Sequence, residues 1–227
     1  PQGRAFGVLS RRVDTRYALH ARVIDLATGR MTPIHDLTSP TARRGDLKQL
    51  RLAVDGAGVV TAVWDREGRV ETARMAANET WSAAELVPAE TVAPIRRVSL
   101  AVSPSGRAAV AWTTMRAAQG RLQASRRDAQ GGWTSASVSD AATNDAPSVA
   151  IADDGRAWVA WIAPEQPLSG PAMVKSVSAD GAWAPAERLS PQGRVAATVV
   201  IGAQPGGDVV AVWGEVTPRP SPAPGNA

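Results

Sequence analysis

A repeat of about fifty residues is the feature that most limits how this chain can fold. Four similar segments, GVVTAVW, GRAAVAW, GRAWVAW and GDVVAVW, occupy residues 58–64, 106–112, 155–161 and 207–213. Their final tryptophans are 48, 49 and 52 residues apart. Each segment follows a short apolar stretch and a turn rich in Gly, Asp or Pro, an order that is typical of a β-hairpin. The repeat therefore predicts recurring pairs of antiparallel strands.

A second set of tryptophans recurs within the same unit. Trp81, Trp133 and Trp183 are 52 and 50 residues apart. Each follows alternating polar and apolar residues and a Gly or Asn turn, which predicts a third strand, a turn, and a fourth strand that begins at the tryptophan. A repeat of about 40 to 50 residues with four short strands is typical of a propeller blade. No helical periodicity extends over roughly ten residues, so we expect little helix.

We predict an all-β fold, a β-propeller of four-stranded antiparallel blades with three complete blades and partial terminal blades. The complete blades are predicted at about residues 47–91, 92–142 and 143–191, and the partial ones at 1–46 and 192–217. Residues 218–227 are predicted to be a Pro-rich linker or tail. This strand count predicts an open or truncated ring, completed by further sequence or another chain. The alternative is a closed ring, which pairing between residues 6–12 and 209–213 would establish.

The repeat also predicts how the sheets pack. A lone four-stranded sheet has two apolar faces, so neighbouring blades must cover them. We expect small side chains on the second strands to let sheets approach closely, namely those of Ala62, Ala111, Ala160 and Ala211. We expect the seven repeated tryptophans to be packing residues, whereas Trp158 lies outside both sets. Exposed edge strands would invite pairing, so a segment with unpaired edges is expected to self-associate.

The turns before the second tryptophans resemble the Asp-box, or BNR repeat, of sialidase-like propellers, in which Ser-x-Asp-x-Gly-x-Thr-Trp joins third and fourth strands. SADGAW at 178–183 is a shortened version, DAQGGW at 128–133 keeps less of it, and NETW at 78–81 keeps the end. The resemblance covers roughly residues 44–213 and implies structural turns away from the ligand face. Sialidases resemble one another in using three arginines, a Tyr paired with Glu, and an Asp. The single tyrosine, Tyr17, aligns with a third strand, so no catalytic residue is assigned and enzyme activity is not favoured.

Charge and composition exclude several classes of function. The 25 Lys and Arg residues are dispersed among 21 Asp and Glu residues, so we expect no nucleic-acid partner. No apolar run approaches the roughly 20 residues of a membrane-spanning helix. The chain has no cysteine, and His20 and His35 lack metal-ligand spacing, so we expect surface or loop histidines, no metal site and no cofactor. Asp55, Asp153 and Asp154 are predicted turn residues.

Candidate ligand-binding residues gather on one predicted face, formed by the loops that enter each first strand and those that join second to third strands. The candidates are Arg44, Arg97, Arg116, Asp145, Glu165 and Arg194. Several converging arginines would bind a carboxylate, sulfate or phosphate through paired hydrogen bonds. Solvated or cross-strand roles are the alternative for these arginines.

These features favour a non-catalytic extracellular recognition module that binds a glycan or a protein through its loops. One alternative is a fragment of a sialidase-like glycoside hydrolase, and another is a structural subunit of a larger assembly. The Ala and Arg bias and the Pro-rich end suggest a high-GC bacterial protein that is secreted or exposed at the cell surface. We expect association with further blades or another chain.

Overall fold

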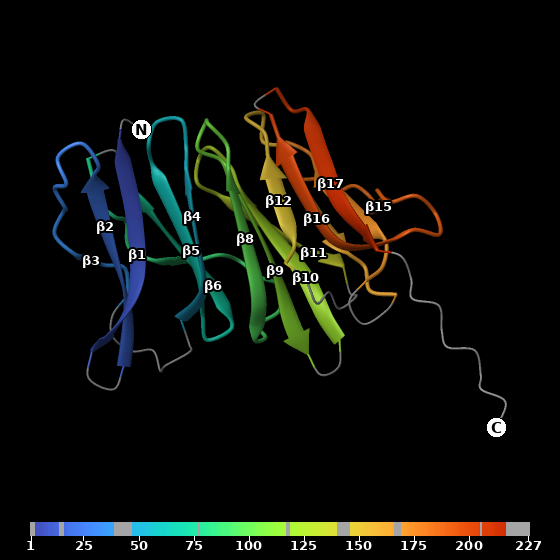
Figure 1. The fold of residues 1–227 in the computed structure, drawn as a ribbon, viewed down its shortest axis with the longest axis horizontal. Helices are drawn as coiled ribbons and strands as arrows, with labels where there is room; N and C mark the ends of the chain where they lie inside the picture. The colour runs from blue at the N-terminus through green and yellow to red at the C-terminus, as the bar shows by residue number, and fades with distance from the viewer. Residues whose placement is uncertain are drawn as a thin grey trace.

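The structure of the chain is a computed structural model. It describes residues 3–13, 16–38, 47–76, 78–116, 119–139, 146–165, 169–204 and 206–216. These residues form antiparallel sheets and contain no helix. The sheets stand in a row that does not close into a ring (Figure 1). The predicted fold class, an open β-propeller with three complete blades and partial terminal ones, is confirmed.

The sheets follow one another in chain order, and we number them as blades 1 to 5. Blade 1 contains β1 (Arg4–Val13), β2 (Arg16–Asp25) and β3 (His35–Asp36). Blade 2 contains β4 (Leu47–Val54), β5 (Val60–Arg66), β6 (Arg69–Met75) and β7 (Glu85–Leu86). Blade 3 contains β8 (Ile95–Val102), β9 (Ala108–Arg116), β10 (Gln119–Arg127) and β11 (Trp133–Ser139). Blade 4 contains β12 (Ser148–Ile151), β13 (Ala157–Ile162), β14 (Ala172–Val177) and β15 (Glu187–Arg188), and blade 5 contains β16 (Val195–Ala203) and β17 (Val209–Val216).

The ring is open at both terminal blades. Blade 1 has three strands and blade 5 has two, and within the described residues β1 pairs with β2 and β17 with β16. The two blades lie at opposite ends of the row (Figure 1), so the closed-ring alternative is wrong. The blade boundaries remain a prediction, and residues 218–227 lie outside the described part. No helix in that part is long and apolar enough to cross a membrane.

Each second strand presents side chains alternately to the two neighbouring blades. Val63 of β5 packs with Val110 and Trp112 of β9, whereas Ala111 of β9 packs with Val159 of β13. We call the side of a blade that packs on the preceding blade its leading face, and the side that packs on the following blade its trailing face. The same two faces recur from blade to blade, so a side chain's repeat position gives the neighbour that it contacts.

The four small alanines all pack between neighbouring blades, but they lie on two different faces. Ala62 packs with blade 1 and Ala211 with blade 4, so both lie on leading faces. Ala111 and Ala160 pack on the following blades and lie on trailing faces. The difference is one residue in register, which moves a strand side chain to the opposite face.

The fourth strands are shorter than predicted in blades 2 and 4. β11 begins at Trp133, but Trp81 and Trp183 form only isolated bridges, with Met75 and Val177. In blade 2 the Ser82 hydroxyl accepts the hydrogen bond of the Arg74 backbone N–H at 3.0 Å, in place of a ladder carbonyl. In blade 4 the ladder is interrupted at Pro185, which has no N–H to donate.

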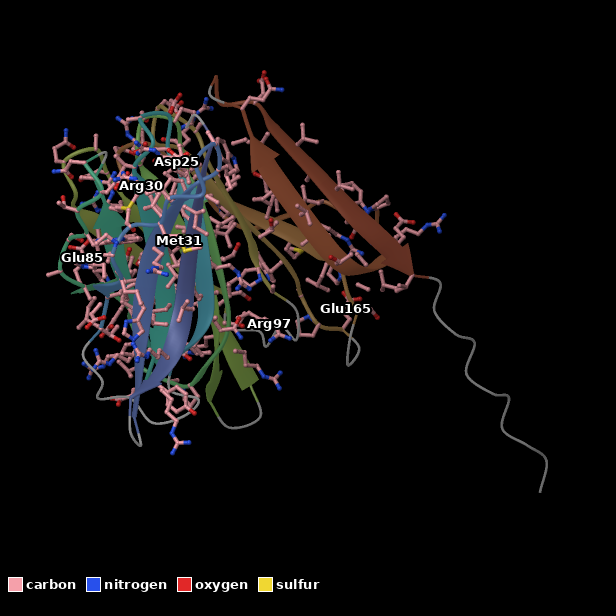
Figure 2. The ribbon with its side chains drawn as sticks, turned by 60° about the vertical axis from the view of Figure 1, so that its left-hand side comes forward. Asp25, Arg30, Met31, Glu85, Arg97 and Glu165 are labelled. Atoms are coloured by element: carbon pink, nitrogen blue, oxygen red, sulfur yellow. The ribbon has the colours of Figure 1, made fainter. Side chains whose placement is uncertain are left out.

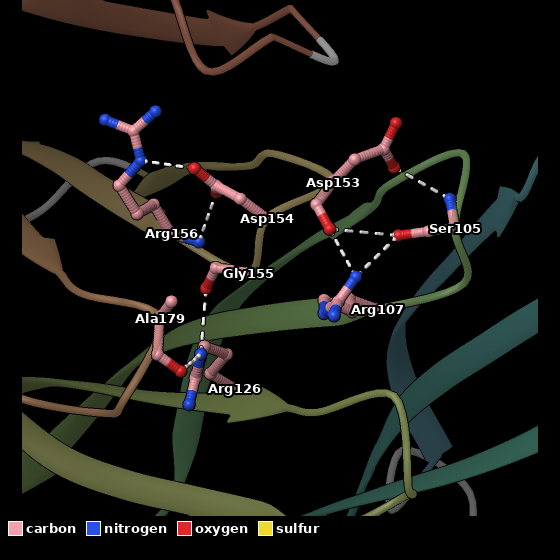
Figure 3. A network of polar contacts seen from close by, with 8 residues as sticks. All are labelled: Ser105, Arg107, Arg126, Asp153, Asp154, Gly155, Arg156 and Ala179. Atoms are coloured by element: carbon pink, nitrogen blue, oxygen red, sulfur yellow. Dashed lines mark hydrogen bonds and ion pairs between the residues drawn. The ribbon is translucent and has the colours of Figure 1, made fainter.

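Polar contacts between the first hairpin turns join blades 3 and 4 (Figure 3). The Ser105 backbone N–H donates to Asp153 Oδ1 at 2.8 Å, and Arg107 donates to the Asp153 carbonyl. Arg126 donates from one Nη1 to two carbonyl oxygens of blade 4, as described below. Asp55 and Asp154 accept backbone N–H bonds within their own turns, so their predicted turn roles are confirmed.

Candidate functional site

The sequence-predicted ligand face lies where first strands begin. Because the strands are antiparallel, the start of β8 lies beside the end of β9, with Ile95 opposite Thr114. Arg97 is exposed there and donates from Nη1 to the Arg96 carbonyl at 3.3 Å. Arg97 and Glu165 both lie toward the end of the molecule away from Asp25 and Arg30 (Figure 2).

The contacts of the other two described candidates, Glu165 and Arg194, lie within blades 4 and 5. The Glu165 backbone N–H donates to the Ser169 carbonyl at 3.2 Å, in a segment that also bridges to β16 through Gly170 and Ala196. Arg194 Nη1 lies 3.6 Å from Glu215 Oε2 on β17, and the Arg194 side chain is 68% exposed. Arg44 and Asp145 lie outside the described residues, as does the side chain of Arg116 at the end of β9. An anion site on this face therefore stays a prediction.

A groove of about 630 Å³ lies at the opposite end of the strands, between blades 2 and 3. Its volume is within the range of about 300 to 1,000 Å³ that is common for ligand pockets. Blade 2 supplies Arg74, Trp81, Ser82 and Glu85, and blade 3 supplies Arg127. We call this cavity the interblade groove. Figure 2 shows Glu85 on the flank of the molecule opposite Arg97.

The repeat places the two arginines face to face across the groove. Arg74 is paired with Thr61 in the β5–β6 register and lies on the trailing face of blade 2. Arg127 is paired with Ala108 and lies on the leading face of blade 3. The residues at the same position as Arg127 in blades 2 and 4 are Met75 and Val177, each 1% exposed. A guanidinium therefore stands where the neighbouring blades bury an apolar side chain.

Gly131 leaves the room that the Arg127 guanidinium occupies. This glycine has a φ of 95°, and a Cβ there would lie 2.8 Å from Arg127 Nη2. The turn is closed by the Gly132 N–H, which donates to Asp128 Oδ1 at 2.7 Å. The shape of the third-to-fourth strand turn thus sets where Arg127 enters the groove.

The positive charge of the groove is only loosely compensated. Arg74 Nη2 lies 3.6 Å from Asp55 Oδ2, and Arg127 Nε lies 3.8 Å from Glu85 Oε1, so neither pair is within good hydrogen-bonding distance. The Nε atoms of both arginines are buried and have no hydrogen-bond partner in the described part of the chain. Burial lowers the pKa of Arg74 and the positive charge of Arg127 lowers it further, while Asp55 and Glu85 raise it.

The corresponding arginine between blades 3 and 4 donates hydrogen bonds to protein carbonyls. Arg126 occupies the same repeat position as Arg74, and its Nη1 donates to the carbonyls of Gly155 at 2.9 Å and Ala179 at 2.7 Å (Figure 3). The side chain is almost entirely buried. Arg126 therefore serves as a link between blades, whereas the two arginines of the interblade groove have donors left for a ligand.

The Glu85 carboxylate lines the remaining groove wall, whereas the Trp81 ring packs on the preceding blade. Trp81 is half-buried and its ring is stacked on that of His35, with centroids 6.4 Å apart. Glu85 accepts a long hydrogen bond of 3.4 Å from Trp133 Nε1 and is about half exposed. Paired guanidiniums and one carboxylate are the groups that would hold an acidic ligand with hydroxyl groups.

Sequence analysis missed this site because its residues were assigned only to strands and turns. The signal is present in the third strands when residues 69–75, 121–127 and 171–177 are aligned, which read RVETARM, RLQASRR and PAMVKSV. Arg127 stands there in the column of Met75 and Val177. A charged residue at a repeat position that is apolar in the neighbouring blades indicates a role other than packing.

His20 is buried, which corrects the prediction that it lies at the surface or in a loop. It lies in β2 with 5% of its surface exposed, and its Nδ1 is 2.6 Å from Asp36 Oδ1 on β3. His35 is exposed, as predicted. Within the described residues, no group of three or more His, Asp or Glu side chains is arranged to hold a metal ion.

Comparison with known proteins shows no family and no curated relative. No protein family matches the sequence, and no curated protein matches it. Similar solved structures include a polysaccharide lyase (TM-score 0.49, 11% identity, 94% of this chain and 52% of that one) and a GH43 β-1,3-galactosidase (0.45, 11%, 91% and 49%). An exo-β-1,3-galactanase from Phanerochaete chrysosporium is also similar (0.40, 14%, 92% and 60%). The chain thus spans about half the length of the first two.

Proposed function

We propose that this chain is a non-catalytic recognition module that binds an acidic glycan in the interblade groove. The observation that carries the proposal is Arg127, which stands opposite Arg74 at a repeat position that is apolar in the adjoining blades. A ligand carboxylate would accept hydrogen bonds from the two guanidiniums. Glu85 would accept hydrogen bonds from ligand hydroxyls.

The two arginines favour a ligand with negative charge. Two guanidiniums that repel each other and have loosely held partners gain most from a group that carries negative charge. A planar carboxylate suits their fork of donors. A neutral sugar would leave the repulsion between the two guanidiniums uncompensated.

We propose binding in preference to hydrolysis because the described lining of the groove contains a single carboxylate. Most glycoside hydrolases act with a pair of carboxyl groups roughly 5 to 9.5 Å apart across the bond that is cleaved. Glu85 is the one carboxylate among the described residues that line the groove. The hydrolase alternative would therefore draw its acid and nucleophile from residues beyond this groove.

From the resemblance to Asp-box propellers we carry over only the structure of the turns. In the turn at 178–183, the Ala182 N–H donates to Ser178 Oγ at 3.1 Å, and the Ser178 hydroxyl also contacts the Asp180 carboxylate. These contacts support a structural role for a reduced Asp-box turn. Secretion, which we proposed from composition, would bring the module into contact with extracellular polysaccharides.

The test is calorimetric titration of the chain with a glucuronate-containing oligosaccharide and with its neutral glucose counterpart. We expect binding of the acidic sugar only. Removal of one charge-assisted contact costs about 1.5 to 3 kcal/mol, so Arg127→Met should weaken binding by about 10- to 150-fold. The matched control is Arg97→Met, which removes an exposed guanidinium at the other end of the strands and should leave the affinity unchanged.

Two outcomes would reject the proposal. Equal affinity for the acidic and the neutral sugar would remove the role of the arginine pair. Loss of binding in Arg97→Met but not in Arg127→Met would instead assign recognition to the loop face that the sequence predicts.

A further inference from the structure

The trailing face of blade 5 is an uncovered apolar sheet face. Val200, Val210 and Val212 are 61%, 56% and 66% exposed, and the β16–β17 register places Val200 opposite Val212. In blades 2 to 4 the residues at the position of Val212 are Val63, Ala111 and Ala160, and each is completely buried. The face therefore has the composition of an interior surface and the exposure of an outer one.

At one position this face carries an apolar residue where blades 3 and 4 carry serine. Val200 occupies the register position that Ser99 holds in blade 3 and Ser148 in blade 4. Ser148 Oγ accepts a hydrogen bond from the Ile201 N–H of blade 5 at 3.0 Å. A valine at this position cannot accept such a bond, so the contact that blade 5 makes on its outer side must be mainly apolar.

Two exposed apolar side chains lie on the leading face of blade 1, at the other end of the row. Leu9 of β1 pairs with His20, on the side of blade 1 opposite Leu19 and Ala21, which pack on blade 2. Leu9 is 51% exposed. Met31 is 53% exposed and lies on this side as well, since Arg22 Nη1 contacts its sulfur at 3.4 Å (Figure 2).

We propose that blade 5 of one copy docks on blade 1 of a second copy, head to tail, and so continues the stack of blades. The contact would repeat the trailing-to-leading packing that already joins each blade to the next within the chain. β1 and β17 are both second strands, so they run in the same direction in such a stack.

This contact uses two different surfaces, so it is heterologous and extends from copy to copy until the rotation closes. It differs in this respect from a symmetric dimer, in which one face meets itself. The difference allows the partner surface to be identified by mixing two variants.

The test measures mass by sedimentation of the purified chain over about two decades of concentration. We expect the weight-average mass to rise at least about twofold with concentration. Val212→Glu and Leu9→Glu should each remain monomeric, and an equimolar mixture of them should form a 1:1 dimer, because each retains the face that the other lacks. Leu86→Glu, which changes an exposed leucine on the outer strand of blade 2, should assemble like the wild type.

Circular dichroism checks that each variant is folded, and Val200→Lys provides a second substitution on the same face. A wild-type chain that stays monomeric throughout would overturn the proposal and assign the face to a different partner. A mixture that does not dimerise while Leu9→Glu alone does would show that blade 5 meets blade 5, and would also overturn it.

Discussion

Substitution of Arg126 tests how much one side chain that links two blades contributes to the free energy of unfolding. Its Nη1 donates to two carbonyl oxygens of blade 4, at 2.9 and 2.7 Å, while the side chain is 7% exposed. Arg126→Met keeps the apolar stem and removes both hydrogen bonds. Each such bond to a charged donor contributes about 1.5 to 3 kcal/mol. Desolvation of the guanidinium and its unpartnered Nε offset part of this, so we expect a net loss of about 2 to 4 kcal/mol in the free energy of unfolding.

Urea unfolding followed by tryptophan fluorescence measures this loss. With a slope of about 2 kcal/mol per molar urea, the midpoint should fall by roughly 1 to 2 M. Arg97→Met is the matched control, because it removes an exposed guanidinium and should change stability by less than about 0.5 kcal/mol. If Arg126→Met changed the midpoint no more than this control does, the two carbonyl contacts would make no net contribution and the proposed link between blades would be wrong.

Further predictions concern the backbone, pH and salt. Gly170→Ala would place a Cβ 1.8 Å from the Ala163 carbonyl oxygen, so the bridge from this segment to β16 should break and the melting temperature should fall by several degrees, as calorimetry would show. The hydrogen bond from the Ser105 N–H lowers the pKa of Asp153 below its ordinary value of 3.8. The Asp153 carboxylate therefore stabilises the folded state fully above pH 3.8, and this contribution is lost as the pH falls through the lower pKa of the folded state. The melting temperature of Asp153→Asn should accordingly depend less on pH in that acidic range. Binding of the glucuronate oligosaccharide should weaken as salt rises, and affinity that is independent of salt would contradict a charged site.

The main features of the fold could be predicted because they depend on local sequence. Trp64 and Trp112 are fully buried, as the repeat predicts for packing residues. Glycines at the hairpin turns adopt positive φ, such as 82° at Gly106, so the positions of the turns are encoded within a few residues. The lengths of the fourth strands could not be predicted, because they depend on how single groups such as Ser82 Oγ compete with the ladder.

The candidate site could not be predicted because it depends on register between strands. Arg126 and Arg127 are adjacent in sequence and both suggest a solvated face. In β10, adjacent side chains point to opposite faces, so Arg126 meets blade 4 and Arg127 meets blade 2. The same limit applies to His20, which the register places beside Leu9 and Asp36 in a sheet and not in a loop. Composition cannot distinguish the two arginines, but their cross-strand partners can.

The same substitution to methionine should have opposite effects on stability and on ligand affinity at the two adjacent arginines, Arg126 and Arg127. Arg127→Met introduces the residue that blade 2 carries at this position, Met75, and removes a buried Nε that lacks a partner, so stability should change by less than about 1 kcal/mol. Arg126→Met should reduce stability and leave the affinity for glucuronate unchanged, because its donors bind protein carbonyls. Measuring both the urea midpoint and the affinity for each variant separates the roles. If both substitutions lowered stability and affinity together, the division between a structural and a ligand-binding arginine would fail, since blade packing and the groove would then be one cooperative unit.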